Sequence, residues 1–307
     1  MRFVARRLLH GALVVWAAYT VTWLLLFLLP SDPVSIMLTG SGNASPETRA
    51  ALEAKYGLDR PPFLQYLLLL GRAATGDLGD SIEYGRPVTD IVLGAVPYTV
   101  QLGLAALAVS IVVGLGVALL ANTARAAWLR TILFSLPSVF LSFPVFLTGL
   151  LLVQVFAFSL HLLPAVGTTG WKSLLLPALT SGIPASAAIA QVTTAAIRDY
   201  LESPQASYLR ARGVTRPQIL LAHALRNALV PAMTILGMQV GGILAGAVIT
   251  ETVFSRQGLG RVLQAGVLSQ DIPLVQGVVV LSALLFVLSS LLVDLVHPLI
   301  DPRVRKA

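Results

Sequence analysis

The segment Arg198–Val230 reads RDYLESPQASYLRARGVTRPQILLAHALRNALV and says most about the fold. It is a basic stretch, broken by turn residues, between two long apolar runs. Three residues in it interrupt a helix: Pro204, Gly213 and Pro217. Thr215 and Gln218 offer a capping box for a new helix that has a proline in its first turn. The segment therefore predicts a helix, a break at glycine and a second helix.

The apolar runs around this segment indicate a polytopic membrane protein. The 307 residues are 56% hydrophobic and 11% charged, and the mean hydropathy is +0.83, far from the usage of soluble proteins. Runs free of Asp, Glu, Lys and Arg cover residues 8–31, 91–124, 131–171, 173–197, 227–250 and 272–293. Each is as long as the roughly 20 residues that a helix needs to cross hydrocarbon. The sequence thus predicts an all-α fold with six transmembrane helices.

The third run is the longest, at 41 residues, and has room for two spans. Three prolines interrupt it, at positions 137, 144 and 164, and its tail from His161 to Trp171 is polar. These features leave room for one span and an exit loop. The run is therefore counted as one span.

The charges are distributed unequally about these spans. With the N-terminus inside, 13 of the 21 basic residues fall in the inner segments 1–7, 122–130, 198–230 and 300–307, and 8 fall outside. Ten of the 14 acids lie outside or at the outer boundary. This distribution follows the positive-inside rule, so a sequence pI near 10.1 needs no nucleic acid to explain it. Both termini are predicted to be cytoplasmic.

The first segment predicts an uncleaved anchor. MRFVARR is followed by an apolar run to Leu29, as at the start of a signal peptide. However, this run exceeds a typical signal-peptide core and no small-residue cleavage site follows it. Residues 1–30 are expected to remain as the first span.

Residues 31–96 form the largest external segment. Ser45 is placed to cap a helix that runs to Lys55. Phe63–Arg72 is too short to span and too apolar for water, so it is expected to lie on the membrane or against the spans. GDLGDS at 76–81 is a turn cluster and lacks the full ligand series of a cation loop.

Small residues mark two of the later spans. The span near 174–197 is rich in Ala, Ser, Thr and Gly, which let helices approach closely, so it is expected to be central. The next span contains two GxxxG spacings that permit tight crossing: Gly237 to Gly241 and Gly242 to Gly246. Because glycine is common in membrane helices, these four glycines need not all pack in this way.

The sequence shows no catalytic or metal-binding constellation. It has no cysteine, four widely separated histidines, and no HExxH or GxSxG motif. None of its three lysines follows a glycine, which excludes a GxxxxGK[ST] phosphate loop. Glu251 and Asp294 sit near span ends, where a carboxylate reaches the interface, whereas proton-coupled carriers hold acids deep inside. No cofactor, metal or enzymatic activity is predicted, and an ion-coupled carrier is weakened but stays open.

Segments spread over nearly the whole chain resemble the inner-membrane permease subunits of ATP-binding cassette (ABC) importers for dipeptides, oligopeptides and nickel. They are MRFVARRLL, YGLDRPPFLQYL, TGDLGDSI, GRPVTDIV, LPALTSGIP, LLAHALRNALVPAMTILG, ETVFSRQGLGR, DIPLVQG and LIDPRVR. Within that family the chain resembles the first, B-type permease of the pair. The resemblance implies the type I ABC importer permease fold in the cell (inner) membrane. Residues 97–298 would be its transmembrane domain with five helices, and residues 299–307 a cytoplasmic tail.

The signature of this family is a cytoplasmic EAA loop, here within residues 198–230. Its glycine falls on Gly213, and Ala211 and Arg212 resemble the residues that precede it in peptide permeases. Residues 207–209 read SYL in place of the acidic-Ala-Ala start, and Arg226 replaces the closing proline. The match to the signature is therefore partial.

The resemblance also implies partners and a mechanism. Two related permeases pair as a heterodimer, two soluble ATPases dock on the EAA loops, and an external binding protein delivers the solute, most often a di- or oligopeptide. ATP binding rocks the permeases between inward and outward states, so the contacts at the loop must differ between these states. The coupling residues expected from this are Ala206, Ala211, Arg212, Gly213, Val214, Thr215 and Arg216.

Overall fold

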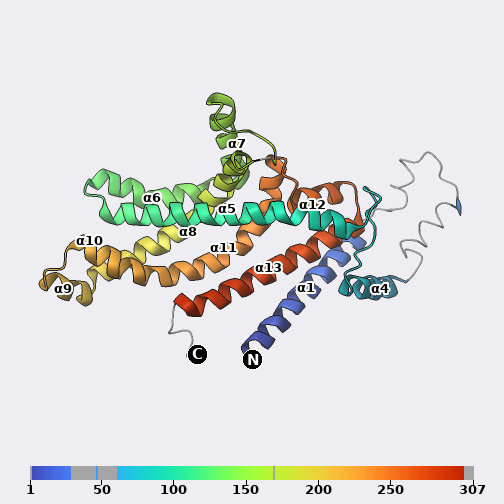
Figure 1. Ribbon diagram of the computed structural model, residues 1–307, viewed down its shortest axis with the longest axis horizontal. Coiled ribbons are helices and arrows are strands. Elements are labelled where there is room, and N and C mark those ends of the chain that lie inside the picture. The colour runs from blue at the N-terminus through green and yellow to red at the C-terminus, as the bar shows by residue number, and fades with distance from the viewer. Residues whose placement is uncertain (1, 29–45, 48–60, 169, 301–307) are drawn as a thin grey trace. The chain divides into compact units, whose positions relative to one another are not determined.

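The computed structural model describes residues 2–28, 46–47, 61–168 and 170–300, with side chains from residue 6 to residue 293 of these ranges (Figure 1). Apart from one isolated antiparallel bridge between Asp80 and Pro87, the regular structure of these residues is helical. The long helices are α1 (Arg2–Leu28), α5 (Val88–Thr123), α8 (Lys172–Glu202), α11 (Leu225–Val253) and α13 (Ile272–Ile300). The predicted all-α fold is confirmed.

Shorter helices connect or flank the long ones. They are α4 (Pro62–Ala74), α6 (Ala127–Ser142), α7 (Val145–Leu152), η1 (Val153–Ser159), α9 (Pro204–Ala211), α10 (Arg216–Gln218), η2 (Ile219–Ala224) and α12 (Leu259–Leu268), where η marks a π-helical turn. Of the helix predicted to begin after Ser45, only residues 46 and 47 are described, and both are helical. The rest of that prediction lies outside the described residues.

Among the described residues, five helices are long and apolar enough to cross a membrane, and a sixth span results if the bent pair α6 and α7–η1 is counted as one. The two parts of this pair are bent by 105°. The break falls at Phe143, which is extended because the ring of Pro144 disfavours a helical conformation in the preceding residue. The run 131–171 thus contains two helices that meet at a sharp bend, followed by a loop, where the sequence predicts one span and an exit loop.

The chain divides into two compact units. Unit 1 comprises residues 1–98 and 257–287, and its core joins the first turns of α5 to α12 and α13 through Val92, Leu259 and Leu274. In the same unit α4 packs against α1: the hydroxyl groups of Thr20 and Tyr66 lie 2.8 Å apart. This contact confirms that the apolar segment before residue 72 lies against a span.

Unit 2 comprises residues 99–256 and 288–307, and α8 is its central helix. The apolar window of α8 is 61% buried, against 11–33% for the other candidate spans. In this unit α8 contacts α6, α7, α9, α11 and η2. The prediction that the small-residue span is central is confirmed, because its small side chains let several helices approach one axis.

Candidate functional site

The candidate coupling site begins where α8 ends. Ser203 has an extended backbone because it precedes Pro204, and this conformation ends α8. The Ser203 side chain then caps the start of α9. The Ser203 Oγ accepts a hydrogen bond from the backbone N–H of Ala206 at 3.3 Å and donates one to the carbonyl of Tyr200 at 2.6 Å. The chain therefore turns sharply at the end of α8 with its polar groups satisfied.

Gly213 ends α9 in the left-handed conformation, with φ of 82°. The Gly213 N–H donates to the Arg210 carbonyl at 2.9 Å, and the Val214 N–H donates to the Leu209 carbonyl at 3.1 Å. These two bonds form a Schellman motif, in which glycine is favoured because it has no Cβ to resist a positive φ. The predicted glycine break is confirmed.

A capping box starts the next helix at Thr215. The Gln218 Oε1 accepts hydrogen bonds from the Thr215 N–H at 3.1 Å and from its hydroxyl at 2.9 Å. From Arg216 the chain then runs through α10, η2 and α11 without interruption, as one helical stretch to Val253. The predicted second helix is therefore the first turn of the next span, and only residues 203–215 separate the two long helices.

The helices on both sides of this turn pack on each other. Ile197 of α8 packs with Leu220, Ala224 and Ala228 of η2 and α11 in one buried cluster. Because packed interiors deform little, a displacement of α9 would be passed to α8 and α11. The turn at residues 203–215 therefore lies between two helices that move together.

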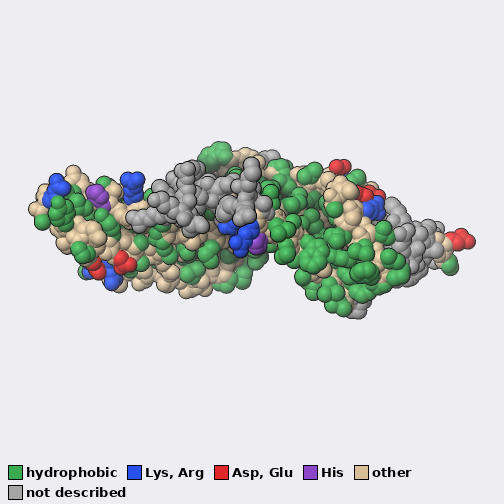
Figure 2. Space-filling model, turned by 90° about the horizontal axis from the view of Figure 1, so that it is seen from below, with side chains coloured by type: hydrophobic (Ala, Val, Ile, Leu, Met, Phe, Trp, Pro, Cys, Tyr) green, Lys and Arg blue, Asp and Glu red, His purple; other side chains and the backbone are tan. Residues whose placement is uncertain are grey.

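The predicted coupling residues differ in exposure. Ala206 is fully buried, so it positions α9 but adds no surface. Val214 is half-buried, and the other five are exposed: Ala211, Arg212, Gly213, Thr215 and Arg216. The Arg212 guanidinium lies 5.8 Å from the centre of the Tyr208 ring, a cation–π arrangement. Figure 2 shows Lys, Arg and His side chains, and acidic side chains among them, on the surface of this end of unit 2.

The four predicted packing glycines of α11 have different surroundings. A Cβ built on Gly237 would lie 2.8 Å from the Val293 side chain of α13, whereas Gly242 and Gly246 have no atom within 4 Å of such a Cβ. The close packing of Gly241 stays a prediction. Two glycines outside the GxxxG pairs, Gly114 and Gly182, form the close approaches between α5 and α8.

Glu251 was expected to reach the interface, and this prediction is wrong. Its side chain lies in the last turn of α11 and is fully buried. One carboxylate oxygen accepts a hydrogen bond from the Thr99 hydroxyl of α5 at 2.6 Å. Arg256 follows, also buried, with its backbone N–H donating to the Glu251 carbonyl at 2.8 Å. The Thr99 hydroxyl gives the buried acid a hydrogen-bond donor inside the protein, and the segment ETVFSRQGLGR is the sequence signal for this cluster.

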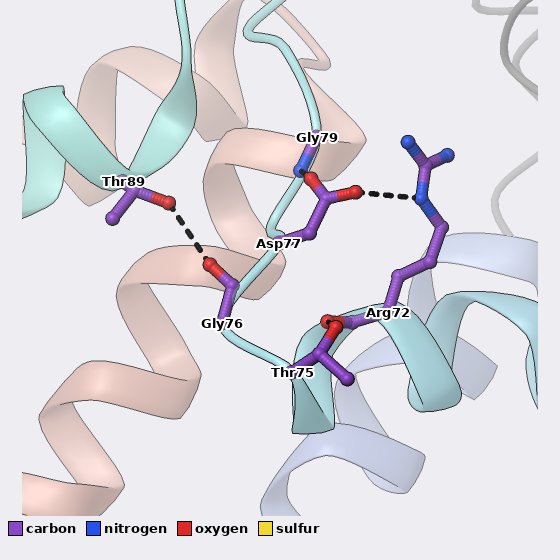
Figure 3. Close-up of polar contacts among 6 residues, drawn as sticks. All are labelled: Arg72, Thr75, Gly76, Asp77, Gly79 and Thr89. Carbon is purple, nitrogen blue, oxygen red and sulfur yellow. Dashed lines mark hydrogen bonds and ion pairs between the residues drawn. The ribbon is translucent and has the colours of Figure 1, made fainter.

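A second polar site lies in unit 1, in the loop between α4 and α5 (Figure 3). Asp77 accepts hydrogen bonds from the Gly79 N–H at 3.0 Å and from the Arg72 Nε at 2.8 Å. These contacts, the Gly79 N–H first, lower the pKa of the Asp77 carboxyl. Thr89 in the first turn of α5 donates to the Gly76 carbonyl at 3.3 Å. The predicted turn cluster is thus an ordered loop, tied to the helices on both sides.

The same loop is fastened to the start of α13. Asp271 is fully buried and accepts hydrogen bonds from the Ser81 hydroxyl at 2.5 Å, the Glu83 N–H at 3.0 Å and the Leu274 N–H at 3.0 Å. The last of these caps α13. One carboxylate therefore holds loop and helix together. Within the described residues, no group of three or more His, Cys, Asp or Glu side chains is placed to hold a metal ion.

Comparison with known proteins agrees with this architecture. Residues 84–306 match the family described as "Binding-protein-dependent transport system inner membrane component", and residues 1–103 match its N-terminal companion, "Binding-prot-dependent transport system membrane comp, N-term". The chain is 32% identical over 309 residues to the "Glutathione transport system permease protein GsiC" of Escherichia coli (strain K12), covering 99% of both chains. The protein of that name from Shigella flexneri serotype 5b (strain 8401) gives the same values.

Solved structures show the same fold. An inward-facing MetNI methionine ABC transporter chain matches with a TM-score of 0.57 and 18% identity, over 69% of this chain and 96% of that one. A chain of an amino acid ABC transporter with histidines matches with a TM-score of 0.51 and 17% identity, over 70% and 94%. Permeases of this family do not hydrolyse ATP themselves, and membership disfavours the ion-coupled carrier. The chain belongs to the binding-protein-dependent inner-membrane permeases and is a multi-pass permease subunit of an ABC importer.

Proposed function

We propose that the turn formed by α9, Gly213 and α10 is the surface on which an ATPase subunit docks and through which it moves the spans. The Schellman motif at Gly213 is the observation that carries this proposal. It places an exposed turn, with Arg212 and Tyr208 on it, between two helices that pack on each other through Ile197 and Leu220. ATP-dependent motion of the turn would reach both spans.

The solute is proposed to be a small peptide. Support comes from the GsiC relatives, whose name specifies glutathione, a tripeptide, and which match this chain over 99% of its length. A second, homologous permease would supply the other half of the pathway, as a heterodimer. The loop around Ser81 and Asp271, rigid and joined to α13, is proposed to contact the external binding protein.

Transport should require the complete complex. Co-expression with the ATPases and the second permease is expected to give a complex that takes up labelled glutathione into proteoliposomes only with ATP and the binding protein. The chain reconstituted alone should not transport, because it has no phosphate loop of its own. Uptake by the chain alone, driven by an ion gradient, would contradict the proposal.

The proposed orientation places the termini and the α9–α10 turn in the cytoplasm. The chain has no cysteine, so single cysteines report position without background. A membrane-impermeant maleimide is expected to label Ser45→Cys in intact cells, and Ser207→Cys only after the membrane is opened. The reverse pattern would refute the orientation.

A further inference from the structure

A cavity of about 750 Å³ lies in unit 2, between the α5–α6 connection and the start of α9. This volume is within the roughly 300–1,000 Å³ of ordinary small-ligand sites. Its charged lining consists of five arginines and one glutamate, a net charge of +4: Arg125, Arg130, Arg198, Arg210, Arg216 and Glu202. Such a lining favours a ligand that carries negative charge.

The arginines of this cavity, called here the arginine cavity, are only partly neutralised. Glu202 forms an ion pair with Arg198 at 3.3 Å, and both side chains are mostly exposed. Within the described part of the chain, no acidic side chain pairs with Arg125, Arg130 or Arg216. Three guanidinium groups are therefore left to bind a ligand. A guanidinium suits phosphate because it can donate two parallel N–H hydrogen bonds to two phosphate oxygens.

Part of the cavity is preorganised. The Arg210 Nη2 donates to the Leu201 carbonyl at 2.9 Å and to the Ser207 hydroxyl at 3.2 Å, which holds this guanidinium against the end of α8. α6 begins between Arg125 and Arg130, with no capping side chain and no acid in its first turn. The uncapped N–H groups and the helix dipole add positive potential beside the arginines.

The surroundings of the cavity indicate a lipid rather than a soluble anion. Phe134 lines the cavity and is 39% exposed, one helical turn after Arg130. α6 exposes further apolar side chains at Leu129 and Ile132, and these can contact acyl chains because lipid tails are as apolar as leucine. Trp128, 68% exposed in the first turn of α6, is the residue type that favours the level of lipid headgroups.

We propose that the arginine cavity binds the phosphate headgroup of an anionic phospholipid of the inner leaflet, with an acyl chain along α6. This site rests on the proposed orientation, which places the cavity on the cytoplasmic side. Basic cavities between spans on that side are suited to anionic headgroups. Since Arg210 and Ala206 of α9 both line the cavity, the bound lipid would also contact the turn at residues 203–215, which is proposed to dock the ATPase.

Fluorescence quenching tests the site on the purified full-length chain in detergent. Replacing Trp16, Trp23 and Trp171 by Phe leaves Trp128 as the only tryptophan. Brominated phosphatidylglycerol is expected to quench Trp128 at a concentration roughly tenfold below brominated phosphatidylcholine, a difference typical of one well-placed charged contact. If the three replacements lower the melting temperature, the difference between the wild type and Trp128→Phe gives the same signal.

Two double variants distinguish the effect of the cavity arginines on lipid binding from the effect of the net charge of the protein. Arg125→Gln/Arg130→Gln is expected to weaken binding of the brominated phosphatidylglycerol about 5- to 30-fold, since each basic residue near an anionic headgroup accounts for about a fivefold change. Arg212→Gln/Arg226→Gln removes the same charge from residues that do not line the cavity, and should change binding less than about threefold. Equal weakening by both pairs, or no preference for phosphatidylglycerol, would overturn the proposal.

Two competitors identify the source of the phosphate. Inorganic phosphate or ATP at millimolar concentration is expected to leave the quenching by phosphatidylglycerol unchanged. Displacement of the lipid by either would assign the cavity to a soluble phosphate and overturn the lipid assignment. The assay needs no ATPase, so failure of the lipid site and failure of the coupling surface are seen separately.

Discussion

Gly213→Val is expected to abolish most ATP-driven uptake while leaving the permease folded. A left-handed conformation costs a residue with a side chain about 1–2 kcal/mol, and a β-branched residue is the least tolerant of it. No atom lies within 4 Å of a Cβ built at Gly213, so the cost is one of backbone conformation and not of collision. The turn should relax to another conformation and move Arg212 out of the proposed docking surface.

Gly213→Asn is the matched control, because asparagine tolerates the left-handed conformation. Solute uptake and ATP hydrolysis are measured in reconstituted complexes that elute and melt like the wild type. The valine variant should lose roughly tenfold in uptake, about the effect of 1.4 kcal/mol, and the asparagine variant much less. Equal uptake by all three proteins would show that the conformation of this turn does not govern coupling.

Gly182→Ala is expected to produce the largest loss of stability among single methyl additions. A Cβ at this position would lie 2.6 Å from the Val109 side chain and 2.8 Å from the backbone oxygen of Ala106, both on α5. A side chain has room to rotate, but the backbone oxygen moves only with the helix. Overpacking of this kind typically costs about 1–3 kcal/mol.

Gly242→Ala provides the comparison for this second prediction. Gly242 is also a glycine within a candidate span, but no atom lies within 4 Å of its built Cβ. The change should be neutral or slightly stabilising, since alanine stabilises a helix by up to about 1 kcal/mol more than glycine does. Thermal unfolding of the isolated chain in detergent measures both variants. Equal melting temperatures for the two would refute the close α5–α8 crossing.

The turn at residues 203–215 could be predicted from the sequence because its determinants are local. Pro204 and Gly213 bound α9 through their own backbone preferences. Thr215 and Gln218 cap the next helix whatever its length. Each of these devices acts within about five residues of the chain. The apolar runs predicted the spans for a similar reason, since length and composition are properties of one segment.

The contacts between helices could not be predicted in this way. Glu251 finds its hydrogen-bond donor in Thr99, 152 residues away in sequence, and only the folded chain shows that the pair is buried. In the same way, the glycine spacing in α11 did not reveal that Gly114 and Gly182 form the close crossing of α5 and α8. Spacing shows which residues share one face of a helix, but not which helix packs on that face.

The proline break in the third apolar run was equally hidden. Pro137 lies within α6, while Pro144 ends that helix and turns the chain by 105°. Prolines are tolerated inside membrane helices when neighbouring groups satisfy the freed carbonyls. Which proline breaks a span is therefore decided by packing.

Crosslinking from Arg212 tests most directly the central claim, that the turn at residues 203–215 docks an ATPase subunit. Arg212→Cys, derivatised with a photoreactive group in the assembled transporter, is expected to crosslink to an ATPase subunit, with a yield that changes when ATP is bound. Tyr84→Cys, in the loop between α4 and α5 that is proposed to be external, serves as the matched position and should reach the binding protein instead. Crosslinks from Arg212→Cys to the binding protein, or to lipid alone while the ATPases remain attached, would contradict the account.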